Sequence, residues 1–112
     1  MKLNFLITAG PTREYIDPVR FLSNASSGKM GYAIGAAAKA AGHKVVLISG
    51  PVSLPRPRGI KFVRVVSAAQ MASEVKKRFA AADIFFSTAA VADYRPAKIL
   101  ASKLKKAGRT SL

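Results

Sequence analysis

The sequence predicts an α/β fold, in the form of a Rossmann-like three-layer domain with a mainly parallel sheet. Apolar, strand-like runs alternate with helical patterns along the chain, and loops rich in glycine and proline separate them. At 112 residues, half of them apolar, the chain is long enough for one hydrophobic core and too short for two. We therefore expect a single domain over residues 1–112, with the strand order 3-2-1-4.

Four strands are expected, at residues 3–8, 44–49, 60–66 and 83–87. The second of them, KVVLIS, is apolar on both faces, which is typical of a strand buried inside a parallel sheet. The third alternates apolar and basic residues, which favours a place near an edge. A long loop from residue 9 to about 24, held by Pro11 and Pro18, follows the first strand. The strand order places this loop beside the loop after the fourth strand, at the sheet edge where such folds bind ligands.

Two helices are expected, over residues 29–41 and 68–80. Serine side chains are suitable N-caps for both: Ser26 or Ser27 for the first helix and Ser67 for the second. Gly42 stands where the first helix should end. The second helix has an apolar stripe at i, i+4 and i+8, formed by Met71, Val75 and Phe79.

The first helix is built mostly of alanine and glycine, which leave little side chain to hold it away from the sheet. Gly31 and Gly35 each cost about 1 kcal/mol of helix propensity relative to alanine. Close packing of the helix backbone against the sheet is the compensation that we expect.

Composition excludes several classes of protein. Cysteine is absent, so the sequence offers neither disulfides nor thiolate metal ligands, and we assign no metal-binding residues. The single histidine, His43, stands in a predicted turn, where a solvated side chain is the favoured interpretation. The start lacks the apolar stretch of a signal peptide, and no run is long enough to span a bilayer. We expect a cytoplasmic protein with no membrane partner.

The net charge is +14, from 19 Lys and Arg against five Asp and Glu. Such an excess indicates attraction to polyanions or to phosphorylated ligands. Nucleic-acid binding would favour basic residues interleaved with exposed aromatics, or a reading helix, and neither pattern is present. From Arg95 onward there are basic residues and no acidic residue. Of two explanations for this basic tail, we favour a chain truncated before an acidic continuation over a surface that binds polyanions.

Two common phosphate motifs fail on this sequence. A P-loop needs glycine at the position of Ser23 and Ser or Thr at the position of Met30. The three-glycine dinucleotide motif is missing after the first strand, because Gly10 is followed by Pro11 and Thr12.

Four separated motifs follow one another along almost the whole chain: TAGPTREYIDPVRFLSNASSGKMGYAI at 8–34, GPVSLP at 50–55, AAVADYRP at 89–96 and KLKK at 103–106. Together they resemble the phosphopantothenoylcysteine synthetase domain of coenzyme A biosynthesis. The resemblance implies a ligase that activates 4′-phosphopantothenate with CTP as cosubstrate, through an acyl-cytidylate, and joins it to L-cysteine. It also implies Mg²⁺ with the nucleotide, and no flavin is expected in this chain because the flavin-dependent decarboxylase is a separate domain of the fused proteins.

The resemblance implies catalytic roles for Asn24, Arg20 and Lys103. Asn24 and Arg20 would contact the pantothenate carboxylate, and Lys103 would reach the phosphates of the nucleotide, where its charge stabilises the transition state. Asn24 also fits a turn or a helix cap.

Nucleotide and substrate binding would fall to Lys103 and to two segments that the predicted topology places side by side: Gly10, Thr12, Ser26, Ser27, Gly28, Lys29, Met30 and Gly31 in one, and Ser87, Thr88, Ala89, Ala90 and Asp93 in the other. The stretch 26–31 also fits an ordinary capped helix start, whose free N–H groups serve either purpose. Asp93 would accept hydrogen bonds from cytosine or ribose, and a salt bridge to Arg95 or a loop cap is the alternative.

The resemblance also implies that synthetase domains continue beyond KLKK and work as homodimers through an arm after the fourth strand. Residues 97–112 would then be such an arm or tail, and ligase activity is expected to be impaired in a chain of this length. Three functional classes stay open at this point: the ligase, a nonenzymatic nucleotide- or phosphate-binding module of the same fold, and a basic domain that binds polyanions.

Overall fold

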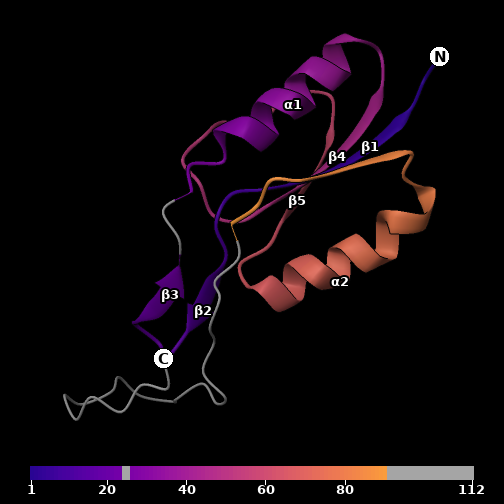
Figure 1. Cartoon of the computed structure of the whole chain (residues 1–112). Helices are drawn as coiled ribbons and strands as arrows, with labels where there is room; N and C mark the ends of the chain where they lie inside the picture. Colours follow the sequence, from indigo (N-terminus) through magenta and orange to yellow (C-terminus); the bar gives the residue numbers. More distant parts are fainter. Residues whose placement is uncertain (24–25, 91–112) are drawn as a thin grey trace.

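The computed structural model of the chain describes residues 1–23 and 26–90. Within them, a four-stranded parallel sheet lies between two helices, which gives the expected three layers (Figure 1). Its strands, in the spatial order β5-β4-β1-β6, are β5 (Lys61–Arg64), β4 (Lys44–Ser49), β1 (Asn4–Ala9) and β6 (Ile84–Ser87). The predicted α/β class and the strand order 3-2-1-4 are therefore confirmed.

The core has two parts because the central strands are covered on both faces. Ile7, Leu47 and Tyr32 belong to the cluster under helix α1 (Lys29–Ala40), and Leu6 and Ile48 to the cluster under helix α2 (Ala68–Arg78). Successive residues of a strand point to opposite faces, so a strand in this position must be apolar throughout. The sequence of β4 meets that requirement, as expected.

Helix α1 begins one residue later than a serine cap would place it. Its N-cap is Gly28, in the left-handed conformation at φ 80°, and no side chain caps it there. The hydroxyl of Ser27 instead accepts a hydrogen bond from the Lys29 N–H at 3.3 Å. The prediction of a serine N-cap is therefore wrong, because the chain must turn through a positive φ that glycine adopts without strain.

The end of α1 follows the prediction. Gly42 has φ 92°, its N–H bonds to the Lys39 carbonyl, and the His43 N–H bonds to the Ala38 carbonyl. This pair of bonds is the Schellman arrangement, which satisfies carbonyls that the helix leaves open.

The close approach of α1 to the sheet depends on one of its two glycines. A Cβ on Gly31 would lie 2.5 Å from the Ala9 Cβ and 2.5 Å from the Thr88 Oγ1, whereas a Cβ on Gly35 would make ordinary contacts at 3.7 Å. The predicted close packing is therefore confirmed at Gly31. At Gly35 the space would accept an alanine.

Helix α2 starts as predicted and ends earlier. Ser67 and Gln70 form a complete capping box, and Met71 is buried. The last turn tightens into a 3₁₀ helix, η1 (Phe79–Ala81), and Phe79 is 56% exposed with its ring edge-on to Phe85. The prediction that Phe79 continues the buried stripe is wrong, because Phe79 caps the end of α2 and its ring packs against the exposed Phe85 of β6.

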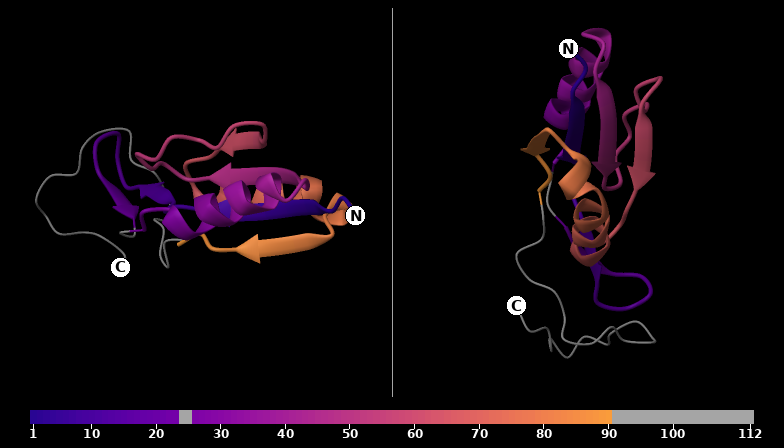
Figure 2. Two further views of the ribbon diagram at one scale, coloured as in Figure 1. Left: turned by 90° about the horizontal axis from the view of Figure 1, so that it is seen from above. Right: turned by 90° about the vertical axis from the view of Figure 1, so that its right-hand side faces the viewer.

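The segment after β1 was predicted to be a long loop. It instead carries a small antiparallel hairpin of β2 (Arg13–Tyr15) and β3 (Phe21–Ser23). Asp17 is buried and accepts hydrogen bonds from the N–H groups of Val19 and Arg20, which closes the turn. Figure 2 shows that the hairpin extends past the end of the main sheet.

The hairpin is held by contacts that are distant in sequence. The Arg13 N–H donates to the Val66 carbonyl at 2.6 Å, and the buried Glu14 carboxylate accepts from the Ala68 N–H at 2.8 Å. Glu14 thus places a negative charge at the start of α2, where the helix dipole stabilises it.

His43 has a structural contact that the sequence did not indicate. Its Nδ1 accepts a hydrogen bond from the Leu3 N–H at 3.0 Å, and its ring lies 5.1 Å from that of Phe5. The side chain is half-buried, so the interpretation of a solvated turn residue is wrong.

In residues 1–23 and 26–90, neither helix has the length and apolar character needed to cross a membrane.

Candidate substrate and nucleotide site

The loops after β1 and β6 are joined by hydrogen bonds at the carboxyl edge of the sheet. The Ala90 N–H donates to the Gly10 carbonyl at 2.9 Å, and the Thr12 N–H donates to the Ala90 carbonyl at 3.1 Å. Pro11 and Ala90 form a parallel bridge between these bonds. The predicted juxtaposition of the two segments is therefore confirmed, and Gly10, Thr12 and Ala90 meet there.

Glycine is required where a third loop presses against this edge. A Cβ on Gly50 would lie 1.6 Å from the Pro11 carbonyl oxygen, so only a glycine fits directly after β4. Gly10 has φ 78°, and a Cβ there would lie 2.9 Å from the Val52 Cγ1. The loops after β1 and β4 thus pack tightly against each other at the edge, with Gly10, Pro11 and Gly50 buried between them.

The start of α1 faces the same edge and suits an anion. The first intrahelical bond runs from the Tyr32 N–H to the Gly28 carbonyl, so the N–H groups of Lys29, Met30 and Gly31 precede the helical ladder. Ser27 accepts from Lys29, and the first turn contains no acidic residue that would neutralise the helix dipole. Lys29 adds a charged, exposed side chain at this point.

Thr88 ties the start of α1 to the segment after β6. Its hydroxyl donates to the Thr8 carbonyl at 2.5 Å, and its Oγ1 lies where a side chain on Gly31 would otherwise be. Thr88 is therefore a building element of the edge, with its hydroxyl turned toward the strand. The other predicted residues around it differ in exposure: Ser87 and Met30 are exposed, Ser26 and Ala89 half-buried.

Arg20 lies apart from these groups. It belongs to the turn at the tip of the hairpin, where its Nε is 3.9 Å from the buried Asp17 carboxylate. The opposite end of the hairpin, at Arg13 and Ser23, adjoins the sheet edge through Thr12, whose carbonyl accepts from the Ser23 hydroxyl at 2.8 Å. Figure 1 shows the β2–β3 hairpin directed away from the four-stranded sheet. The turn of this hairpin contains Arg20, so the structure does not bring Arg20 together with the edge formed by Gly10, Gly31 and Thr88 within one chain.

Three predicted site residues lie outside the described residues: Asn24, Asp93 and Lys103. The arm predicted over residues 97–112 also lies outside them. Their roles stay predictions.

A pair of arginines that the sequence analysis did not single out borders the same edge. The guanidinium groups of Arg56 and Arg64 lie 5.6 and 5.7 Å from the ring centre of Phe62, which in turn packs edge-on against Tyr32. These residues line a cavity of about 230 Å³ together with Ser49, whose hydroxyl bonds to the Tyr32 hydroxyl at 2.8 Å. The only signal in the sequence was two arginines near an aromatic residue, which is too common to predict a site.

The described residues contain no group of three His, Cys, Asp or Glu side chains that could hold a metal ion. Mg²⁺ commonly binds through one or two carboxylates and the phosphates of a substrate. The Mg²⁺ that the resemblance implies with the nucleotide stays a prediction.

The family model described as "DNA/pantothenate metabolism flavoprotein C-terminal domain" matches residues 1–112. The chain belongs to this family. It is 57% identical over 103 residues to the coenzyme A biosynthesis bifunctional protein CoaBC of Vibrio vulnificus, a match that spans 92% of the chain and 26% of that relative. It is 55% identical over 104 residues to the protein of the same name from Escherichia coli, and again covers 26% of it.

Two solved structures show the same fold. The C-terminal domain of a CoaBC protein superposes with a TM-score of 0.83 at 50% identity, over 88% of the chain and 50% of that structure. The chain thus spans half of that solved domain. A Cab2 mutant, H337A, superposes with a TM-score of 0.78 at 17% identity, which shows a likeness of fold alone.

Proposed function

We propose that this domain acts in coenzyme A biosynthesis as a phosphopantothenate–cysteine ligase that uses CTP. The observation that carries the proposal is the joined edge of the sheet, where Gly10, Thr12 and Ala90 pair beside the uncapped start of α1. That edge is built from two of the motifs that resemble the synthetase, and relatives more than half identical to the chain are named as coenzyme A biosynthesis proteins.

The reaction explains why such an edge is needed. A carboxylate oxygen of 4′-phosphopantothenate attacks the α-phosphorus of CTP, and the bond to the leaving pyrophosphate breaks. The amine of L-cysteine then attacks the acyl carbon, CMP leaves, and the amine loses a proton. Both reactants of the first step are anions, so the protein must hold them together with positive charge and fixed N–H donors.

Within this proposal, the start of α1 binds phosphate oxygens. The N–H groups of Met30 and Gly31 and the Lys29 side chain supply the donors, beside the edge that Gly10 and Thr88 build. Asn24 and Arg20 would contact the carboxylate, while Asp93 and Lys103 would bind the base or ribose and the phosphates. Mg²⁺ would enter with the CTP phosphates and offset part of their charge.

We further propose that the active form is a homodimer. Arg20 stands at the tip of a hairpin that projects from the sheet, and this tip exposes apolar surface at Val19 (61% exposed) and Phe21 (40% exposed). A partner chain that covers this surface would bring Arg20 toward a sheet edge. The cytoplasmic location expected from the sequence stays a prediction.

A pyrophosphate-release assay tests the ligase. The chain should release pyrophosphate from CTP only when 4′-phosphopantothenate is present, at the impaired rate expected for a chain of this length, and release from ATP should be slower still. Asn24→Asp should lower the rate, because it replaces a neutral amide donor beside the carboxylate with a second negative charge. Binding of CTP without pyrophosphate release would contradict the ligase and support a nonenzymatic nucleotide-binding module.

A further inference from the structure

A second cavity, of about 530 Å³, lies at the opposite, amino edge of the sheet. It extends between the first residues of the strands and the last turn of α2. Six basic side chains line it: Lys2, Lys39, Lys44, Lys61, Lys77 and Arg78. No acidic side chain is among the residues that line it in the described part of the chain. Asn4, Phe5 and Leu6 of β1 line this cavity, so the second half of the strand, roughly 10 Å, separates it from the candidate site.

The geometry of the sheet brings two of these lysines onto one face. Lys44 pairs with Asn4 and stands two residues before Val46, while Lys61 pairs with Val46 itself. Val46 packs in the cluster under α2, and side chains two residues apart share a face, so Lys44 lies on that face too. The same alternation places Lys61 there, two residues before Val63.

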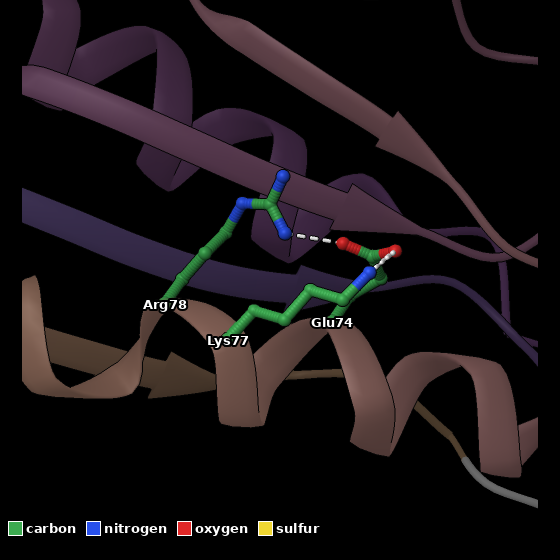
Figure 3. Close-up of polar contacts among 3 residues, drawn as sticks. All are labelled: Glu74, Lys77 and Arg78. Carbon is green, nitrogen blue, oxygen red and sulfur yellow. Dashed lines mark hydrogen bonds and ion pairs between the residues drawn. The ribbon is translucent and has the colours of Figure 1, made fainter.

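The last turn of α2 closes the cavity on that face. Figure 3 shows Lys77 and Arg78 reaching from the helix to the Glu74 carboxylate, with Arg78 directed toward the strands. Burial acts to raise the pKa of Glu74, but hydrogen bonds from Arg78 and Lys77 and their positive charge outweigh it and hold the pKa below its usual value. Glu74 therefore stays ionised and offsets part of the local charge.

The other acid at this edge is Asp83, whose carboxylate accepts the Asn4 N–H at 2.7 Å. Its charge also reduces the positive potential. Glu74 and Asp83 together still leave a clear excess of cations around the cavity.

Helix dipoles explain only part of this cluster. Lys39 is in the last turn of α1, and Lys77 and Arg78 are in the last turn of α2, where cations stabilise the negative helix end. Lys44 and Lys61 belong to strands, so that explanation does not apply to them. Lys44 and Lys61 are diagonal neighbours on one face of the sheet, so their like charges add to the positive potential of the cavity.

His43 borders the cavity from the α1 side of the sheet, where its ring packs against Phe5 and its Nδ1 accepts the Leu3 N–H. On the α2 side, the cations at Lys44, Lys61, Lys77 and Arg78 border the same cavity. A site lined by several cations is suited to phosphate oxygens.

We propose that the amino-edge cavity is a second binding site, for a small ligand that carries two or three linked phosphates. The volume is that of a small-molecule pocket, which favours such a ligand over a nucleic-acid backbone. The site is separate from the proposed ligase site, because the two lie at opposite ends of the strands.

Inorganic tripolyphosphate is the probe for this site, followed by amide NMR shifts of the isotope-labelled chain. Shifts are expected at Lys44, Lys61 and Lys77, saturating with one dissociation constant. The double variant Lys44→Glu/Lys61→Glu should weaken this binding at least tenfold. Glu74→Gln should strengthen it, because Lys77 and Arg78 lose their competing partner.

Lys29→Glu is the matched control, since it reverses one charge at the other end of the strands and should leave the amino-edge shifts unchanged. The milder Lys44→Gln/Lys61→Gln variant, checked by thermal melting, serves if charge reversal unfolds the chain. Shifts confined to residues 26–31, or unchanged binding in the lysine variants, would overturn the proposal. Tighter binding of duplex DNA than of tripolyphosphate at this edge, with a steep salt dependence, would overturn it as well.

Discussion

Single side-chain volumes decide how closely the first helix approaches the sheet. At Gly31 the helix touches both β1 and the segment after β6, so the absent Cβ lets three parts of the candidate site meet. At Gly35, four residues further along the same helix, there is room for a methyl group. The sequence predicted close packing at both glycines. The spacing of the two glycines along the helix does not show that Gly31 faces the end of a strand whereas Gly35 faces flexible side chains.

Gly31→Ala and Gly35→Ala are therefore expected to change stability in opposite directions. Gly31→Ala should lower the free energy of unfolding by about 1–3 kcal/mol, since the new Cβ overlaps Ala9 and Thr88. Gly35→Ala should raise it by roughly 0.5–1 kcal/mol through better helix propensity. Urea unfolding of both variants beside the parent chain measures this, and a change of the same sign in both would contradict the packing described.

Glu74 gives the stability a predicted pH dependence. Its pKa is lowered in the folded chain, so its contribution is present above the unfolded-state pKa and is lost as the pH falls through the folded-state value. Glu74→Gln should accordingly destabilise the chain slightly at pH 7 and not at all once the carboxylate is protonated in both states. Urea unfolding of parent and variant at pH 7 and near pH 2.5 tests the sign, and a larger difference in acid would contradict it.

Among the elements, those with long regular patterns were predictable and the hairpin was not. β4 has the predicted bounds, and Ser67 begins α2 as expected, because an unbroken apolar run and a capping box are local signals. The strands of the hairpin have only three residues each, and contacts with Val66 and Ala68 hold them in place. Such contacts are distant in sequence, so no local pattern predicts them.

The bond from Ala68 to Glu14 should matter for the hairpin as a whole. Glu14→Gln replaces a charged acceptor at a helix start with a neutral one and should cost about 1–2 kcal/mol of stability. Faster hydrogen exchange is expected at Arg13–Tyr15 and at Ala68, with the rates in β4 unchanged. Ala72→Gly is the control, since it lowers the helix propensity of α2 at an exposed position away from Val66 and Ala68. Equal protection of the hairpin in Glu14→Gln and parent would show that other contacts position it.

At the scale of the whole molecule, the parallel topology was predictable because alternation of strands and helices leaves few permitted arrangements. The topology also predicted that the segments containing Gly10 and Ala90 meet. The sequence did not show that Arg20 lies in the turn of a hairpin, away from the sheet edge, since that position depends on how Asp17 closes the turn. The arginines at the cavity beside Phe62 were missed because their proximity is created by folding.

Association through the hairpin tip is expected to depend on its exposed apolar side chains. Val19→Asp should shift the chain from dimer to monomer in light scattering at high concentration, because it places a charge in the proposed interface. Ala37→Asp, on the exposed face of α1, is the control and should leave the mass unchanged. A monomeric mass for the parent chain at high concentration would contradict the homodimer.

The most direct test of the central claim is a calorimetric titration of CTP with Mg²⁺ into the parent chain, Lys29→Glu and Lys61→Glu. If the carboxyl edge is the nucleotide site, the parent should bind CTP saturably, Lys29→Glu should bind it at least tenfold more weakly, and Lys61→Glu should retain most of the affinity. Any CTP that binds through its phosphates in the amino-edge cavity should appear as a second, separate event that only Lys61→Glu removes. The absence of CTP heat in the parent chain would contradict the carboxyl-edge site. A single binding event that is lost in Lys61→Glu and kept in Lys29→Glu would contradict it as well.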